Sequence, residues 1–168
     1  MSKNPIDNVI WMPTIELVAN DYNPNVVFNK ELELLKFSLL KTGWIQPILA
    51  SLTNIIIDGF HRFWLACNDA DMVRRYNQQV PVCLLDLNEP ERMLLTVRIN
   101  RAKGSHVALR MHDLISKVYN DFDYTKAEIA HQIGANIDEV ELLLTENVFQ
   151  KLDIKNHKYS KAWIPGRS

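Results

Sequence analysis

The sequence predicts an α+β fold that is followed by an all-α part. Short apolar runs bounded by turn residues, at 47–51, 54–57 and 80–85, are typical of β-strands. Longer segments between them carry their apolar residues on one helical face, and from residue 107 onward every pattern is helical. This change of character predicts three parts: a mixed domain at 1–105, a helical domain at 106–150 and a basic tail at 151–168.

The mixed domain is predicted to begin with a short strand at 14–18 and a turn at 20–25, where Asn, Asp and Pro favour turn conformations. A helix then covers 29–42. Asn29 stands at the N-cap position of this helix, and Gly43 is placed to end it. The apolar face of the helix is formed by Leu32, Leu35 and Leu39.

The rest of the mixed domain alternates strands and helices. Gly59 ends the second apolar run, and a proline with two acids opens the last helix well, because acids favour the positive end of the helix dipole. The predicted elements are strands at 47–51 and 54–57, a helix at 61–70, a strand at 80–85 and a helix at 89–100.

Composition excludes several classes of protein. The 168 residues are 47% hydrophobic, which is enough for a core, and the net charge of −1 provides no global attraction to nucleic acid or to a membrane surface. No apolar run approaches the roughly 20 residues of a membrane span, and the N-terminus lacks the apolar region of a signal peptide. Cys67 and Cys83 have no metal-ligand spacing and are expected to be buried and reduced, so we expect a cytoplasmic protein with no membrane partner.

The junction between the second apolar run and the next helix has the chemistry of an anion site. The segment reads Asp-Gly-Phe-His-Arg, from Asp58 to Arg62. Free N–H groups at a helix start attract anions, Gly59 allows a close backbone approach, and His61 and Arg62 add donors. Asp58 could hold Mg²⁺, act as a base, cap the turn or orient Arg62. The alternative is that His61 caps the helix while Arg62 pairs with a surface acid.

Three sequence boxes resemble the ParB N-terminal/sulfiredoxin superfamily. The resemblance covers roughly residues 14–106 and implies a small mixed sheet with helices that binds a nucleotide phosphate at the helix start. The first box precedes a strand, the second precedes a helix, and the third is a polar loop after the next helix. The boxes consist of Leu35, Ser38, Leu39, Gly43, Gln46, Pro47 and Ile48; Gly59, Phe60, His61 and Arg62; and Asn100, Arg101 and His106.

Departures from the known branches narrow the chemistry that this resemblance implies. Sulfiredoxins carry a catalytic cysteine where this chain has Phe60, so their reaction is excluded. Chromosome-segregation ParB proteins bind CTP through Gly-Glu-Arg-Arg, which differs from Gly-Phe-His-Arg. The Asp-Gly-x-His-Arg form is closer to the free-serine kinase branch, in which the pocket holds an adenine nucleotide. The implied cofactor is therefore ATP, ADP or CTP, with Mg²⁺ as an option, and the phosphate ligands are Gln46, Gly59, Phe60, His61, Arg62, Asn100, Arg101 and His106.

The full pattern most resembles the prophage co-activator type called IbrB-like. The segments that carry this resemblance are NDYNPN, GWIQPI, DGFHR, NRAKGSH and YSKAW. It implies a role in transcription regulation on a mobile element and a partner similar to phosphoadenosine-phosphosulfate reductase. A homodimer is a further expectation.

The helical part has the spacing of a helix-turn-helix, with Ala130, Gly134 and Val140 at the positions where two helices meet, turn and pack. Ile129, Ile133, Ile137 and Leu144 are expected to complete its core. Its charge is wrong for a DNA reader, because residues 124–150 hold one lysine against five acids. The alternative is a partner-binding module. The tail at 151–168 carries a net charge of +4 with Tyr159 and Trp163 interleaved, which could contact a nucleic-acid backbone or remain solvated.

Two functions from different classes follow. The first is a regulator that binds a nucleotide and contacts DNA or a protein through the helical part. The second is an enzyme, either a small-molecule phosphotransferase or a nucleotide hydrolase, with Asp58 as its candidate catalytic residue. Nuclease activity ranks last because the sequence lacks the clustered carboxylates of two-metal cleavage, and no metal site is predicted from the histidine spacing.

Overall fold

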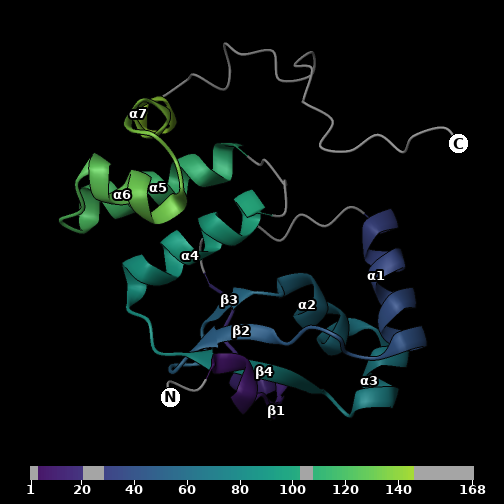
Figure 1. The fold of residues 1–168 in the computed structure, drawn as a ribbon. Coiled ribbons are helices and arrows are strands. Elements are labelled where there is room, and N and C mark those ends of the chain that lie inside the picture. The colour runs from purple at the N-terminus through teal and green to yellow at the C-terminus, as the bar shows by residue number, and fades with distance from the viewer. Residues whose placement is uncertain (1–3, 21–28, 103–107, 146–168) are drawn as a thin grey trace, which may run out of the picture.

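A computed structural model describes residues 4–20, 29–102 and 108–145. It contains a four-stranded sheet with the strand order β1-β4-β2-β3. In Figure 1, helices α1, α2 and α3 lie at one end of the sheet, while α4 lies between the sheet and the cluster of α5, α6 and α7. The predicted α+β fold with a small mixed sheet is confirmed.

The first strand differs from the prediction. A 3-10 helix, η1 (Pro5–Asn8), precedes β1 (Ile10–Pro13), and the segment expected to be a strand begins with a second 3-10 helix, η2 (Thr14–Glu16). The turn exposes 91% of Ile15 but buries Leu17, although a strand would place both on one face. Val18 alone keeps an isolated bridge, to Ile55.

The three other strands lie where the apolar runs predict them. Strand β2 (Ile48–Ser51) pairs in parallel with β4 (Gln79–Leu85) and antiparallel with β3 (Ile56–Asp58). The central strands are buried because both faces of the sheet contact other elements. Their core consists of Met12, Leu17, Ile48, Ala50, Ile56, Ala66, Val80 and Val82.

Three helices cover one end of the sheet: α1 (Asn29–Thr42), α2 (Phe60–Asn68) and α3 (Ala70–Tyr76). The apolar face predicted for α1 packs on Leu65 and Met72 through Leu39. Gly43 follows α1 with a φ of 84°, a left-handed conformation that glycine adopts without strain. The helix predicted at 61–70 is two helices, because Asp69 accepts the backbone N–H groups of Asp71 and Met72 and so caps a new one.

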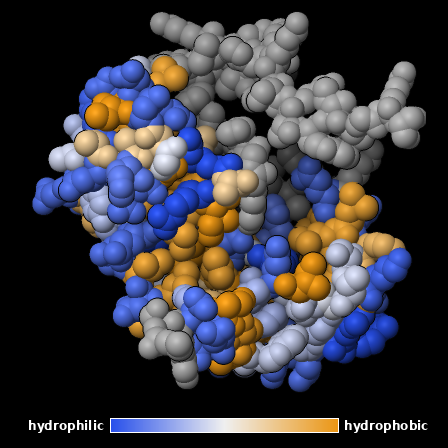
Figure 2. Space-filling model, viewed as in Figure 1, coloured by the Kyte–Doolittle hydropathy of each residue, from blue (hydrophilic) through white to orange (hydrophobic). Residues whose placement is uncertain are grey.

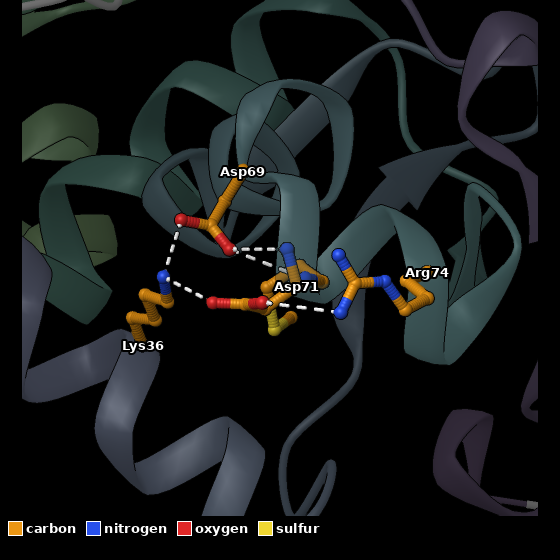
Figure 3. Close-up of polar contacts among 5 residues, drawn as sticks. Lys36, Asp69, Asp71 and Arg74 are labelled. Carbon is orange, nitrogen blue, oxygen red and sulfur yellow. Dashed lines mark hydrogen bonds and ion pairs between the residues drawn. The ribbon is translucent and has the colours of Figure 1, made fainter.

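An ion-pair network joins α1 to the junction of α2 and α3. Lys36 Nζ lies 2.8 Å from Asp69 Oδ2 and 2.8 Å from Asp71 Oδ2, so one ammonium group bridges two carboxylates (Figure 3). The bonds to both aspartates raise the pKa of Lys36. The network fixes α1 against the start of α3.

The remaining helices form a second core. They are α4 (Glu89–Ala102), α5 (Ala108–Asp121), α6 (Lys126–Ile133) and α7 (Ile137–Leu144). Residues Met93, Leu94 and Val97 of α4 pack in one cluster with residues of the three later helices. Helix α4 also contacts β3, so it belongs to both packing layers. The domain boundary predicted at residue 105 falls outside the described residues, as does the basic tail at 151–168, and both stay predictions.

Helices α6 and α7 meet at a short turn with Gly134 in the left-handed conformation, at a φ of 67°. Ala130 and Val140 are buried where the two helices pack, as their spacing indicates. Thr125 and Glu128 form a reciprocal capping box at the start of α6. The expectation for Ile137 is wrong: it is 48% exposed, because it occupies the first position of α7 and points away from the cluster.

Within the part of the chain that the structure describes, no helix is long and apolar enough to cross a membrane. Figure 2 shows hydrophobic surface between α4 and the sheet and again beside α1. On α1 the exposed apolar side chains are Leu34 and Phe37, with Lys41 over the ring of Phe37.

Candidate functional site: the glycine turn at the start of helix α2

The site begins where β3 passes into α2 through Gly59. This glycine has a φ of 97° and is the N-cap of α2 without any side-chain cap. Phe63 N–H donates to Gly59 O at 3.0 Å, which starts the helical hydrogen bonding. The N–H groups of the first turn have no helical carbonyl partner, so they present positive dipoles to the space in front of the helix.

Arg62 lies directly beneath this turn and is 8% exposed. Its Nη1 donates to Gln46 Oε1 at 2.6 Å, and its Nη2 donates to Asp58 Oδ2 at 3.2 Å. Burial lowers the pKa of Arg62, and the Asp58 carboxylate acts in the opposite direction. A guanidinium nevertheless stays protonated at every ordinary pH, so the turn contains a buried positive charge.

Asp58 therefore has a visible structural partner. Of the four roles open to it from sequence, the geometry displays the orientation of Arg62, through a contact between positions i and i+4. Gln46 completes the arrangement from the segment before β2. The first and second sequence boxes are thus joined by the hydrogen bonds of one guanidinium group.

His61 and Phe60 occupy the first turn of α2 in opposite ways. His61 is exposed, and its ring lies edge-on to the ring of Phe60, with centroids 6.4 Å apart. Phe60 is 8% exposed and its ring packs against Phe63, with centroids 6.1 Å apart. Phe60 can therefore meet a ligand through its backbone N–H, while its side chain belongs to the core.

Arg101 of the third sequence box is bound to the helical part of the chain. Arg101, near the end of α4, donates from Nη1 to Glu139 Oε1 at 2.5 Å and from Nη2 to Gly134 O at 3.4 Å. Its guanidinium thus holds the start of α7 and the turn before it. Asn100 is half-buried on the same helix, and His106 lies outside the described residues.

Contacts that no sequence pattern indicates join α4 to the strands next to the site. Thr96 Oγ1 donates to Ile57 O at 3.3 Å, one residue before Asp58. Arg92 Nη1 donates to Ser51 Oγ at 3.3 Å. A threonine and an arginine inside a helix carry no sequence signal for such contacts, because both are common on exposed helix faces.

The arrangement can bind an anion. It combines an uncapped helix start, an exposed histidine and a buried guanidinium, which are the features that phosphate groups meet in proteins. The described residues contain no group of three or more His, Cys, Asp or Glu side chains that could hold a metal ion.

Comparison with curated proteins finds a relative that spans nearly the whole chain. The uncharacterized protein YbdM of Escherichia coli (strain K12) is 32% identical over 165 residues, which are 96% of this chain and 78% of the relative. No protein-family model matches the chain.

Solved structures show the fold. The C-terminally truncated chromosome-partitioning protein ParB from Caulobacter crescentus, complexed to the centromeric parS site, matches with a TM-score of 0.55 and 21% identity, covering 85% of this chain and 76% of that one. A Pnob8-like ParB-N domain matches with a TM-score of 0.51 and 15% identity, covering 81% and 63%. The Caulobacter ParB complexed with CTP-gamma-S reaches a TM-score of 0.46, below the level that shows a shared fold.

The structural matches and the sequence match support different conclusions. The two matches with TM-scores of 0.55 and 0.51 show a common architecture, here that of ParB N-terminal domains. Their identities of 21% and 15% are too low to show a common function, so the chemistry of the site must be argued from its own residues. The match to YbdM is stronger because it combines 32% identity with nearly complete coverage. The chain has the ParB-like fold and belongs to the same protein family as YbdM.

Proposed function

We propose that this protein is a ParB-like regulator that binds a nucleotide through a phosphate group at the Asp-Gly-Phe-His-Arg turn. One observation carries the proposal: the uncapped start of α2, with Gly59 in the left-handed conformation, lies directly against the buried guanidinium of Arg62. The N–H groups of the turn and His61 would contact the phosphate. Gln46 and Asp58 would hold Arg62 as a fixed positive charge behind it.

The geometry favours a binding protein over an enzyme. A phosphotransferase or a nucleotide hydrolase of this type needs an acid that faces the reacting phosphate or its acceptor. Asp58 instead accepts a hydrogen bond from Arg62 at 3.2 Å. A regulator that only binds the nucleotide requires the cationic residues alone. An ion pair that holds Arg62 in place is therefore compatible with such a regulator. The enzyme remains the second candidate because Asp58 is the nearest acid to the turn in sequence.

The helical part would contact a DNA or protein partner. The acids of α7 that weigh against DNA are partly neutralised within the chain, since Glu139 pairs with Arg101 and Glu141 pairs with Lys126. The ParB of the same fold is complexed to a DNA site. The resemblance to IbrB-like proteins adds a role on a mobile element, a partner similar to phosphoadenosine-phosphosulfate reductase, and a homodimer.

Calorimetric titration of ATP, ADP, CTP and phosphoadenosine-phosphosulfate tests the nucleotide site. His61→Ala removes an exposed donor together with its ring contact to Phe60. His131→Ala, at an exposed histidine on α6, is its matched control. We expect one of the four nucleotides to bind the wild type and the control with equal affinity. The same nucleotide should bind His61→Ala about tenfold more weakly, because the variant loses one charge-assisted hydrogen bond. Equal nucleotide affinity in all three proteins would show that the turn does not bind the nucleotide.

Two further measurements separate the candidates. Nucleotide turnover with Mg²⁺, measured for the wild type and for Asp58→Asn, should be absent if the protein is a switch. Turnover that the substitution abolishes would establish the enzyme instead. A mobility-shift titration of duplex DNA at two salt concentrations tests the helical part, because DNA binding through phosphate contacts weakens steeply with salt.

A further inference from the structure

Arg92 is a buried arginine that has no acidic partner among the described residues. It lies in the first half of α4 and is 9% exposed. Its side chain makes one hydrogen bond to the described residues, from Nη1 to Ser51 Oγ at 3.3 Å. Its Nε is sealed from solvent and has no acceptor, whereas Nη2 is not sealed in this way. The guanidinium is therefore largely buried, with Nε in the interior of the molecule.

The single acceptor of Arg92 is already saturated. Ser51 Oγ also accepts the backbone N–H groups of Thr53 at 3.2 Å and Ile55 at 3.1 Å, and it lies 2.9 Å from Thr53 Oγ1. A hydroxyl oxygen has two lone pairs, so three N–H donors exceed its capacity. The long bond from Arg92 consequently contributes little to neutralising the charge.

The acids nearest to Arg92 along α4 are engaged elsewhere. Glu89 Oε1 accepts from Lys117 Nζ on α5 at 3.0 Å, and Glu91 Oε2 accepts the backbone N–H of Asn88 at 2.8 Å. No ion pair within 4.0 Å joins Arg92 to an acid among the described residues. A buried charge without a counter-ion is costly, which makes this position one that gains from an external anion.

We propose that Arg92, together with the hydroxyl group of exposed Thr53, forms a second anion site that takes a phosphate-type oxyanion. Nη2 carries two N–H donors on a permanent positive charge, which suits an oxygen of such an ion. The ligand would bind from the solvent side at Nη2, between the β2–β3 turn and α4. Its source is either a free inorganic oxyanion or the phosphate group of a nucleotide.

This site is separate from the glycine turn. Strand β2 places Ile48 against Gly59 at one end and Ser51 against Arg92 at the other. Three residues of extended chain span about 10 Å, so the two guanidinium groups belong to opposite ends of one strand. The inference therefore does not depend on nucleotide binding at the turn, and a test can address each site alone.

Thermal unfolding in sodium phosphate, compared with sodium chloride of equal ionic strength, tests the site. We expect phosphate to raise the Tm of the wild type and of His61→Ala by more than that of Arg92→Met, which keeps only the glycine turn. Arg74→Met is the matched control, because the Arg74 side chain is 81% exposed. Phosphate affinity should fall at least about tenfold with Arg92→Met, as expected when a charged donor is removed. An equal rise in Tm for all four proteins would overturn the proposal.

A spectroscopic measurement on the wild type keeps the test decisive if Arg92→Met does not fold. The Nε–H resonance of Arg92 in a proton–nitrogen correlation spectrum should shift saturably with phosphate and stay in place with chloride. An unmoved resonance at saturating phosphate would refute the site. Adenosine monophosphate, titrated into His61→Ala, identifies the source: a tighter response than to phosphate assigns a nucleotide, and an equal response assigns the free oxyanion.

Discussion

The guanidinium of Arg62 lies so close to Gly59 that a Cβ at position 59 would stand 2.9 Å from Arg62 Nη2. The same added carbon would lie 3.3 Å from the Cα atom of Ile48, which cannot move aside without shifting β2. Position 59 thus requires glycine for two reasons: the φ of 97° is unfavourable for other residues, and a Cβ would have no room beside Arg62 and Ile48. The turn and the buried charge beneath it form one packed unit.

Gly59→Ala should destabilise the protein more than Gly134→Ala. Both glycines have positive φ, but a Cβ at Gly134 meets no atom within 4 Å, so that variant carries backbone strain alone. We expect about 1–2 kcal/mol for Gly134→Ala and about 2–4 kcal/mol for Gly59→Ala, where overpacking is added. Urea unfolding measures both, and equal losses would show that the contact with Arg62 and Ile48 relaxes freely.

Asp58→Asn should lower stability because it removes the counter-charge of Arg62. The side chains are 10% exposed for Arg62 and 22% exposed for Asp58, so solvent screens the pair poorly. We expect a loss of about 2–3 kcal/mol in the free energy of unfolding. Asp86→Asn, at an exposed position after β4, is the control. If the two variants unfold alike, the ion pair contributes nothing to the fold.

The Lys36–Asp69 contact should make stability depend on pH in the acidic range. Burial raises the pKa of Asp69, but hydrogen bonds from Lys36, Met72 and Asp71 outweigh it, so the net effect is a lowered pKa. The folded state then binds fewer protons than the unfolded chain. The contribution of Asp69 is fully present above its unfolded pKa of about 3.9 and is lost as the pH falls through the lower folded pKa.

Asp69→Asn tests this dependence, because asparagine still caps α3 but carries no charge. The wild type should be more stable than the variant at neutral pH, and the difference should shrink as the pH drops through that window. Asp123→Asn, an exposed aspartate between α5 and α6, should show a difference that does not change in this way. A constant difference for Asp69→Asn would mean that its charge does not stabilise the helix junction.

The Arg101–Glu139 ion pair should couple α4 to α7 weakly but measurably. The side chains are 21% and 38% exposed, which places the pair near the surface. A double-mutant cycle with Arg101→Met and Glu139→Gln should give a coupling of about 0.5–1 kcal/mol that decreases with added salt. The more exposed pair Lys126–Glu141 is the comparison and should couple less. A coupling of zero would leave α7 held by its apolar face alone.

Local patterns predicted most of the elements. The apolar runs at 47–51, 54–57 and 80–85 match β2, β3 and β4 closely, because strands buried on both faces read as continuous apolar segments. The first strand was misplaced because TIELV alternates like a strand, although the chain turns there and Thr14 N–H donates to Gln78 O. That bond joins residues distant in sequence and leaves no local pattern.

For the site, the sequence predicted the turn and offered the contact between Asp58 and Arg62 as one of several roles for Asp58, but it did not predict the bond from Arg62 to Gln46. Asp58, Gly59, His61 and Arg62 stand in one short motif, and the structure brings Gln46 to them. Arg101 was grouped with the phosphate ligands because of its place in a polar box, yet its visible partner is Glu139 on a helix 38 residues away. Nothing in the sequence indicates that Arg92 is buried, since a lone arginine within a helix is usually exposed.

The sequence by itself determined the three strands after residue 47, the helix at 29–42 and the glycine turn before α2, because these depend on side-chain periodicity and backbone restrictions within a few residues. Tertiary structure alone decided the strand order, the burial of Arg62 and Arg92, and the choice of Glu139 by Arg101. The physical reason is that the partner of a charge is set by which elements pack together, and that packing joins residues whose separation along the chain carries no signal.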